Sequence, residues 1–217
     1  MELTERVVLV TGAARRIGHA IAECLARDGA HLAVHYHTSA AAAEETVAVC
    51  RAAGGAAEAF AADLADPDAA RDLVRRVLDW QGRLDVLVNN ASVFEPQTLA
   101  DFDVAAWERT LRVNVTAPLV LAHAAHAALR TARGRIVNLC DAATGQLWPD
   151  HLAYIVSKSA LETLTRVLAR ALAPDVNVVG VAPGVAAWPE HYDADARARL
   201  TARIPLQRAG TPEDIAA

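Results

Sequence analysis

The stretch Arg6-Val-Val-Leu-Val-Thr-Gly-Ala-Ala-Arg-Arg-Ile-Gly18 decides the fold, because it leads from a buried strand into a helix through a glycine turn. Its first half is a short, continuous apolar run, and apolar residues at helical spacing follow as far as Gly29. Gly12 supplies the turn, and Gly18 permits close packing of the helix. This junction points backbone N–H groups and a helix dipole at one place, which predicts a pyrophosphate site. An ordinary strand-to-helix turn is the alternative.

Strands and helices alternate along the rest of the chain. Further strands are expected at 31–36, 55–60, 84–88, 134–140 and 176–181, and helices at 40–53, 67–80, 100–111, 113–132 and from before 154 to 173. Helices placed between consecutive strands predict a parallel, doubly wound α/β sheet of the Rossmann type, with helices on both faces. The ligand of such a sheet lies at the carboxyl ends of the strands.

The composition bounds the class of protein. The 217 residues are 53% hydrophobic and 22% charged with a formal net charge of −5, which favours one domain over 1–217 and argues against nucleic-acid binding. No leader peptide or membrane-spanning run is recognisable, so a cytoplasmic protein is expected. Cys24, Cys50 and Cys140 lack metal-ligand or redox-pair spacing. They are expected to be small buried hydrophobes, and no metal site is expected.

The segment after the second predicted strand favours a phosphate over a free ribose hydroxyl. A carboxylate usually meets the ribose 2′-hydroxyl near this point, and none occurs before Glu44. The segment His37-Thr38-Ser39, with Ser39 as a helix N-cap, and the nearby Arg15 or Arg16 could together meet a 2′-phosphate. Histidines that merely end a strand are the alternative.

Polar residues also follow the next two strands. Asp63 could hold an adenine amino group, or it could cap its own loop. Asn89 and Asn90 could bridge strands and cofactor while Ala91 leaves room for a ring, with an Asx turn as the alternative. Asn114 lies inside an apolar helical stretch, where it is expected to bind a water or to kink the helix.

The segment from Asp141 to Lys158 holds the residues best suited to proton transfer. Tyr154 and Lys158 are four residues apart on a predicted helix and therefore project from the same face. Lys158 is the only lysine of the chain, and its ammonium is expected to lower the pKa of the Tyr154 phenol from about 10 toward neutrality. Asp141 follows the fifth strand, where it either takes part in the chemistry or caps the strand end. A surface Tyr and Lys on an amphipathic helix is the alternative for that pair.

These motifs, in this order, resemble the short-chain dehydrogenase/reductase family over the whole chain. They are Thr11-Gly12 with Gly18, Asp63-Leu64, Asn89-Asn90-Ala91, Asn114, Tyr154 with Lys158, and Pro183-Gly184. Within that family the sequence is most similar to the pteridine reductases. Asp141 stands where the family usually has a serine, and Arg16, the run 35–37 and the stretch 89–96 are similar to that subgroup. Thr38 departs from it, because arginine is frequent there.

The resemblance implies roles for individual residues. It places an NADP site at Gly12, Arg15, Arg16, Ile17, Gly18, His37, Thr38, Ser39, Asp63, Leu64, Asn90, Ala91, Tyr154, Lys158, Pro183 and Gly184. It places a substrate site at Arg16, Ser92, Phe94, Asp141, Tyr154 and Trp188. The implied catalytic set is Asp141, Tyr154, Lys158 and Asn114, with Asn114 ordering a water of the proton relay.

The implied activity is hydride transfer from NADPH to a ring C=N bond of a pterin or dihydropterin, by a homo-oligomer that is a dimer or a tetramer. A carbonyl reductase acting on a ketone or a 3-oxoacyl substrate is the second possibility, although a carboxylate at 141 would repel a developing oxyanion. A non-catalytic NADP-binding protein is the third. The segment 210–217 resembles the start of a helix that the family continues into a last strand, so an exposed sheet edge is expected in its absence.

Overall fold

The computed structural model describes residues 2–186, 188 and 192–217. Among these residues, six strands form one parallel sheet in the order β3-β2-β1-β4-β5-β6. The strands are β1 (Val7–Val10), β2 (His31–Tyr36), β3 (Ala57–Ala61), β4 (Val86–Asn89), β5 (Arg135–Leu139) and β6 (Asn177–Val181). The predicted parallel α/β sheet is confirmed.

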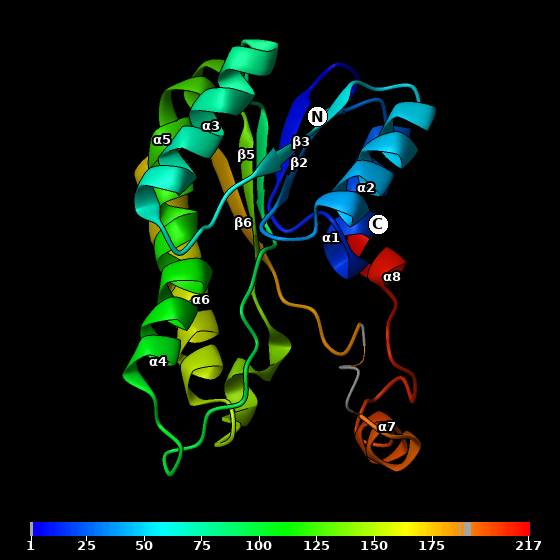
Figure 1. Ribbon diagram of the computed structural model, residues 1–217, viewed down its shortest axis with the longest axis vertical. Coiled ribbons are helices and arrows are strands. Elements are labelled where there is room, and N and C mark those ends of the chain that lie inside the picture. The colour runs from blue at the N-terminus through cyan, green and yellow to red at the C-terminus, as the bar shows by residue number, and fades with distance from the viewer. Residues whose placement is uncertain (1, 187, 189–191) are drawn as a thin grey trace.

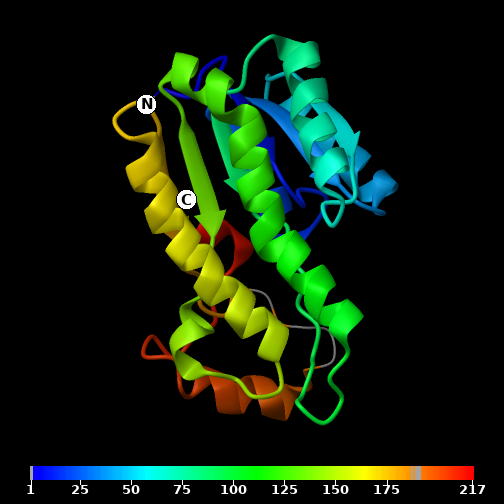
Figure 2. The same ribbon diagram turned by 90° about the vertical axis from the view of Figure 1, so that its left-hand side faces the viewer.

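Helices cover both faces of the sheet (Figure 1). On one face lie α1 (Arg16–Arg27) and α2 (Ala40–Ala52), and α8 (Pro212–Ala216) packs against α1. On the other face lie α3 (Pro67–Gln81), α5 (Ala117–Ala132) and α6 (Leu152–Leu172), which run side by side in Figure 2. The α4 helix (Val104–Leu111), the π-helical turn η1 (Arg112–Thr116), the 3₁₀ helix η2 (Ala142–Gln146) and α7 (Ala194–Thr201) lie toward the carboxyl ends of the strands.

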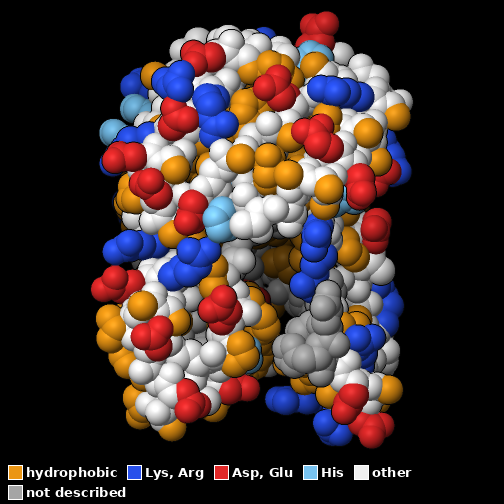
Figure 3. All heavy atoms as spheres, in the orientation of Figure 1, with side chains coloured by type: hydrophobic (Ala, Val, Ile, Leu, Met, Phe, Trp, Pro, Cys, Tyr) orange, Lys and Arg blue, Asp and Glu red, His pale blue; other side chains and the backbone are white. Residues whose placement is uncertain are grey.

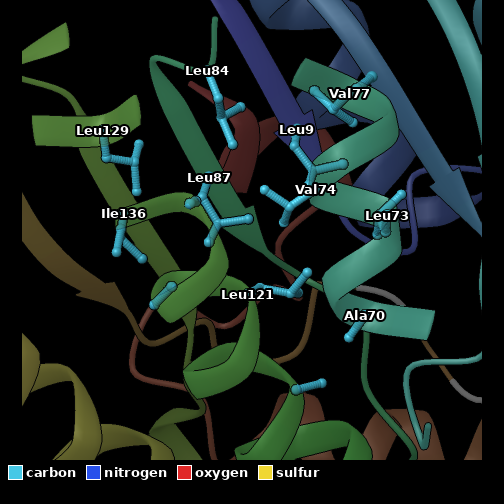
Figure 4. Close-up of a cluster of buried hydrophobic side chains, with 14 of the residues drawn as sticks. Leu9, Ala70, Leu73, Val74, Val77, Leu84, Leu87, Leu121, Leu129 and Ile136 are labelled. Carbon is cyan, nitrogen blue, oxygen red and sulfur yellow. The ribbon is translucent and has the colours of Figure 1, made fainter. Parts of the chain in front are cut away.

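The core has two layers because successive side chains of a strand point to opposite faces. In β1, Val7 and Leu9 belong to the cluster under α3 and α5, whereas Val8 and Val10 belong to the cluster under α1 and α2. Figure 4 shows the first cluster, in which leucines and valines of the sheet and of α3 and α5 interdigitate. The central strands are therefore apolar throughout, which explains the continuous apolar runs in the sequence.

Helix ends account for the differences from the sequence prediction. The helix expected from 100 begins at Val104 instead, because the Asp103 carboxylate caps it by accepting from the N–H of Ala106 at 2.9 Å. α7 was not predicted, although Asp193 caps it in the same way.

Two further observations concern burial. Cys24 is only half-buried, so the expectation of buried cysteines is right for Cys50 and Cys140 alone. In the described part of the chain β6 forms one edge of the sheet, and its Val179 and Val181 side chains are exposed.

None of the described helices is long and apolar enough to cross a membrane.

The reversal of strand order places the ligand site. The chain proceeds from β1 to β2 and β3 on one side and to β4, β5 and β6 on the other. The carboxyl ends of β1 and β4 therefore lie side by side at the switch point, where open α/β sheets bind ligands. Gly12 follows β1 and Asn90 follows β4, so the two motifs meet there.

Candidate active site

A cavity of about 960 Å³ opens at the carboxyl ends of the strands. In Figure 3 the molecule is hollowed between the α4 and α6 side and the α7 side, with basic side chains at the rim. Most residues predicted from the sequence line this cavity: Gly12, Arg15, Arg16, Ile17, Gly18, His37, Asp63, Leu64, Asn90, Ala91, Ser92, Phe94, Asp141, Tyr154, Lys158, Pro183, Gly184 and Trp188. Thr38, Ser39 and Asn114 are not part of the lining.

The glycine turn packs closely against the segment that follows β4 and against the start of α1. Gly12 has a φ of +63°, which favours glycine. A side chain at Gly18 would place its Cβ 2.2 Å from the Gly12 carbonyl oxygen and 2.6 Å from Asn90 Nδ2. The expectation that Gly18 permits close packing is therefore confirmed.

His35 holds this turn from the neighbouring strand, a role that the sequence did not reveal. Its Nδ1 accepts from the Gly12 N–H at 3.0 Å, and its Nε2 donates to the Ala62 carbonyl at 3.1 Å. Burial lowers the pKa of His35 to about 4. The imidazole is thus neutral at physiological pH, as an acceptor for Gly12 must be.

The paired asparagines bridge strands, as one of the two sequence interpretations expected. Asn90 Nδ2 donates to the carbonyls of Thr11 at 2.8 Å and Gly12 at 3.1 Å, which ties β4 to the glycine turn. Asn89 Nδ2 donates to Asn138 Oδ1 at 2.8 Å and so joins β4 to β5.

Asp63 closes its own loop, which is one of the two roles that the sequence left open, and its contact with an adenine stays a prediction. Its Oδ1 accepts from the Ala65 N–H at 2.9 Å, which closes its own loop. Its Oδ2 faces the cavity, 3.8 Å from His37 Nε2 and 3.7 Å from Arg109 Nη1. Ser39 occupies the N-cap position of α2, but its side chain makes no capping hydrogen bond.

Asp141 and Tyr154 form the polar centre of the cavity. The Tyr154 hydroxyl donates a short hydrogen bond to Asp141 Oδ2. The other carboxylate oxygen of Asp141 accepts from the Ala143 N–H at 2.7 Å and caps η2. One oxygen therefore caps η2, as one interpretation of Asp141 expected, and the other accepts from the phenol. A part for Asp141 in the chemistry stays a prediction.

The expected effect of Lys158 on the Tyr154 phenol is wrong for the ligand-free protein. Burial, and then the adjacent Asp141 carboxylate, raise the pKa of Tyr154 above its usual value. The Lys158 ammonium lies 5.8 Å from the centre of the Tyr154 ring and donates to the Leu139 carbonyl at 2.7 Å rather than to the phenol. The phenol therefore stays protonated across the neutral range, which is the form of a proton donor.

Lys158 is a buried cation whose ammonium has more hydrogen-bond donors than the described residues use. Its side chain is almost fully buried, and burial lowers its pKa to about 8, although Asp141 opposes that shift. An ammonium has three donors, and the Leu139 carbonyl is the single acceptor that the described residues provide. A polar ligand in the cavity would supply the others.

Asn114 does not line the cavity, but it is hydrogen-bonded to Val93, which does. It lies in η1, so the predicted irregularity of the helix is a π-helical turn. Its Oδ1 accepts from the Val93 N–H at 2.8 Å, and its Nδ2 donates to the Val93 carbonyl at 3.0 Å and to Ser157 Oγ at 2.9 Å. These bonds fix the segment that holds Phe94. The proposed water relay stays a prediction.

A row of aromatic rings lies beside the polar centre. Phe94, 36% exposed, stacks on His151 with ring centroids 4.5 Å apart and meets Tyr154 edge-on at 4.6 Å. Trp148 lies 5.9 Å from His151. Farther along the cavity, Trp188 and Tyr192 have ring centroids 6.3 Å apart.

Several lining residues were missed in the sequence. Arg109 comes from α4, and Leu200, Arg203 and Ile204 come from α7 and the turn after it. No local motif distinguishes them, because tertiary packing alone brings these segments to the cavity. His151 could have been noticed, since it lies three residues before Tyr154, at the N-cap of α6. Among the described residues no group of His, Cys, Asp and Glu is arranged to hold a metal ion.

The comparisons with known proteins agree with this geometry. The family model for short chain dehydrogenases matches residues 6–195. The chain therefore belongs to the short-chain dehydrogenase/reductase family of oxidoreductases.

Two relatives and one solved structure show what the chain is similar to. An uncharacterized oxidoreductase of Methylorubrum extorquens is 38% identical, with 99% of this chain and 89% of the relative aligned. A 3-oxoacyl-[acyl-carrier-protein] reductase of Synechocystis is 36% identical, over 99% of this chain and 87% of the relative. The crystal structure of FolM alternative dihydrofolate reductase 1 from Brucella canis, complexed with NADP, superposes with a TM-score of 0.92 at 36% identity, covering 99% of this chain and 87% of that chain.

Proposed function

We propose that this protein reduces a ring C=N bond of a pterin or dihydropterin with NADPH. One observation carries the proposal: the Tyr154 hydroxyl in the cavity is hydrogen-bonded to a carboxylate, Asp141. A ring nitrogen that gains electrons needs a proton, and a phenol backed by a carboxylate can supply one. A developing oxyanion would instead be repelled by that carboxylate.

The residues of the cavity fit an NADP molecule. Gly12, Ile17 and Gly18 line the cavity beside the start of α1, where the backbone N–H groups of a helix N-terminus could meet a pyrophosphate. Asp63 and Leu64 would hold the adenine, and Asn90, Ala91, Pro183 and Gly184 would flank the remaining parts. His37, Arg15 and Arg16 line the end where a 2′-phosphate is expected, and β2 is followed by no acid before Glu44.

The cofactor supplies the hydride when bound. Lys158 would hold the nicotinamide ribose with the ammonium donors that the Leu139 carbonyl leaves unused. Tyr154 would give its proton to the ring nitrogen, and the raised pKa keeps the phenol in the protonated form until then. Asp141 accepts from the hydroxyl and fixes the position of the phenol oxygen, and the proton would turn from this carboxylate to the ring nitrogen when the substrate binds.

Phe94 and Ser92 would contact the substrate, together with Trp188 and Arg16. Phe94 offers an exposed ring surface beside Tyr154, and flat heterocycles stack well on such a surface. The similarity to a dihydrofolate reductase crystallised with NADP supports a pteridine substrate and the NADP cofactor.

A carbonyl reductase is the second candidate, and the similarity to a 3-oxoacyl-[acyl-carrier-protein] reductase favours it. Asp141 is the feature against it, because its carboxylate would lie beside the carbonyl oxygen as that oxygen develops negative charge.

We also propose a homo-oligomer, either a dimer or a tetramer. The exposed Leu119 on α5 and Val156 and Val167 on α6 support a contact surface there, and sedimentation velocity would test it.

The activity is tested by following NADPH oxidation with purified protein and a panel of oxidised pterins, dihydropterins, dihydrofolate and small ketones. We expect turnover with at least one pteridine at a kcat/KM above that of every ketone. Tyr154→Phe is the control for enzyme-independent oxidation. Turnover of ketones alone would replace the proposal by the second candidate.

A further inference from the structure

The ring of Phe94 contacts two other rings, those of Tyr154 and His151. The proposed function assigns no role to His151. The rings of Phe94 and His151 are nearly parallel, with an interplanar angle of 18°. Phe94 and Tyr154 are nearly perpendicular, at 86°. His151 and Tyr154 both come from the start of α6, so a single rigid element fixes the Phe94 ring from two directions.

The backbone, not the imidazole nitrogens, holds His151 in place. Its carbonyl accepts from the Ile155 N–H at 3.0 Å. Gln97 pairs with this segment, because its N–H donates to the Asp150 carbonyl at 2.8 Å and its carbonyl accepts from the Leu152 N–H at 3.1 Å. The loop that holds Phe94 is thereby joined to the start of α6.

The imidazole contributes a flat face rather than a hydrogen bond. His151 is 5% exposed, and neither ring nitrogen has an aligned hydrogen-bond partner among the described residues. Its Nδ1 lies 3.1 Å from Asp150 Oδ1, but the pair is not aligned for a hydrogen bond. Both nitrogens are shielded from solvent, and His151 lines the same cavity as Phe94, which covers one face of the imidazole.

We propose that His151 is a positioning residue that fixes the plane of Phe94 and thereby makes the site selective for flat heteroaromatic substrates over small ketones. The inference rests on the proposed function, in which Phe94 stacks on the pteridine. Rotation of a phenylalanine ring about χ2 is broad when nothing confines it. A ring that is already confined loses no rotational entropy when a substrate stacks on it. Only a flat substrate stacks on the ring face, so only a flat substrate gains binding free energy from the confinement.

Four variants test this: His151→Ala, His151→Phe, Phe94→Ala and the double alanine variant, each assayed with one pterin and one ketone. His151→Ala should raise the pterin KM roughly tenfold, the range of one aromatic pair, with a much smaller change in kcat and in the ketone KM. His151→Phe keeps the flat face and should restore the pterin KM. The double variant should be no worse than Phe94→Ala, because His151 acts through Phe94.

His123→Ala is the matched control, since it removes an exposed histidine from α5. Failure of His151→Phe to restore the KM would show that the nitrogens matter and would overturn the inference. The inference would also be overturned if the double variant raised the pterin KM by the product of the fold-changes of the two single alanine variants. A wild type that reduces no pterin refutes the proposed function and this inference with it, whereas an active wild type with an unchanged KM in His151→Ala refutes the inference alone.

Discussion

The hydroxyl of Tyr154 donates to the carboxylate of Asp141, which lies 13 residues earlier in the chain and follows β5. The same carboxylate caps η2 through the Ala143 N–H. The proton donor is therefore held by a group whose own position is fixed by backbone. A carboxylate at this position disfavours a developing oxyanion beside Tyr154.

Asp141→Ser should lose pterin reduction and gain carbonyl reduction. A serine hydroxyl cannot share a proton with Tyr154 as a carboxylate does. The substitution also removes a negative charge from beside a developing oxyanion, which should raise the rate of carbonyl reduction by roughly two powers of ten. Steady-state kcat/KM values on one pterin and one ketone measure both changes. Asp141→Asn is the control, because its side-chain oxygen can still cap η2. If Asp141→Asn retained full pterin activity, the charge of Asp141 would have no part in the reaction.

Tyr154→Phe should reduce kcat for the pterin by about a hundredfold to ten-thousandfold, the usual contribution of a general acid. The phenol supplies a proton rather than affinity, so NADPH binding should stay close to that of the wild type. Isothermal titration with NADPH and single-turnover kinetics check the two parts. A large loss of NADPH affinity would show that the phenol mainly holds the cofactor.

NADPH binding should weaken as the pH rises through about 8, where burial places the pKa of Lys158. The ammonium is the form that donates to the ribose, so loss of its proton removes that contact. The Kd should rise by up to about tenfold per pH unit above this point for one linked proton. In Lys158→Met the Kd should be higher and should not depend on pH in this range. An identical pH profile in the variant would assign the titration to another group.

The same lysine should lower the stability of the ligand-free protein at neutral pH. Its folded pKa of about 8 lies below the ordinary lysine value of 10.5, so the unfolded chain binds more protons between these values. The free energy of unfolding should therefore increase as the pH rises from about 8 to 10.5. Lys158→Met should raise this free energy at pH 7, by on the order of 1 to 3 kcal/mol. Urea unfolding at several pH values measures it, and a less stable variant at pH 7 would contradict the prediction.

NADPH should bind more tightly than NADH. Arg15→Ala should weaken NADPH by roughly tenfold while changing NADH little, because a charged hydrogen bond to a phosphate is lost. Arg15 has extended backbone, so alanine fits there, whereas Arg16 has a φ of +54° at which alanine would be strained. Arg71→Ala, an exposed change on α3, is the control. Equal losses for both cofactors would point to the pyrophosphate instead.

The parts of the fold that the sequence could predict are those fixed by local pattern. The bounds of β2 agree with the expected strand, because the apolar residues 32–34 are followed by a polar segment that begins at His37. Gly12, Gly18 and Asn90 were recognised because the junction of β1 with α1 requires small residues and bridging amides. The switch point then follows from the alternation of strands and helices.

The parts that could not be predicted depend on burial and on distant contacts. The spacing of Tyr154 and Lys158 suggests a phenol with a lowered pKa, but burial and Asp141 reverse that direction. Arg109 reaches the cavity because α4 packs against α6, and its Nη1 there lies 3.7 Å from Asp63 Oδ2. The part played by His151 depends on the pairing of its segment with Gln97, which no spacing in the sequence indicates.

The most direct test of the account uses NADPH deuterated at the transferred position. The protein is incubated with this cofactor and an oxidised pterin, and the product is examined by proton NMR and mass spectrometry. We predict one deuterium on a ring carbon that was part of a C=N bond, and in Tyr154→Phe a rate of incorporation that is lower by the same factor as kcat. A pterin that remains unlabelled, while a ketone in the same mixture becomes a deuterated alcohol, would contradict the claim that this site reduces a ring C=N bond.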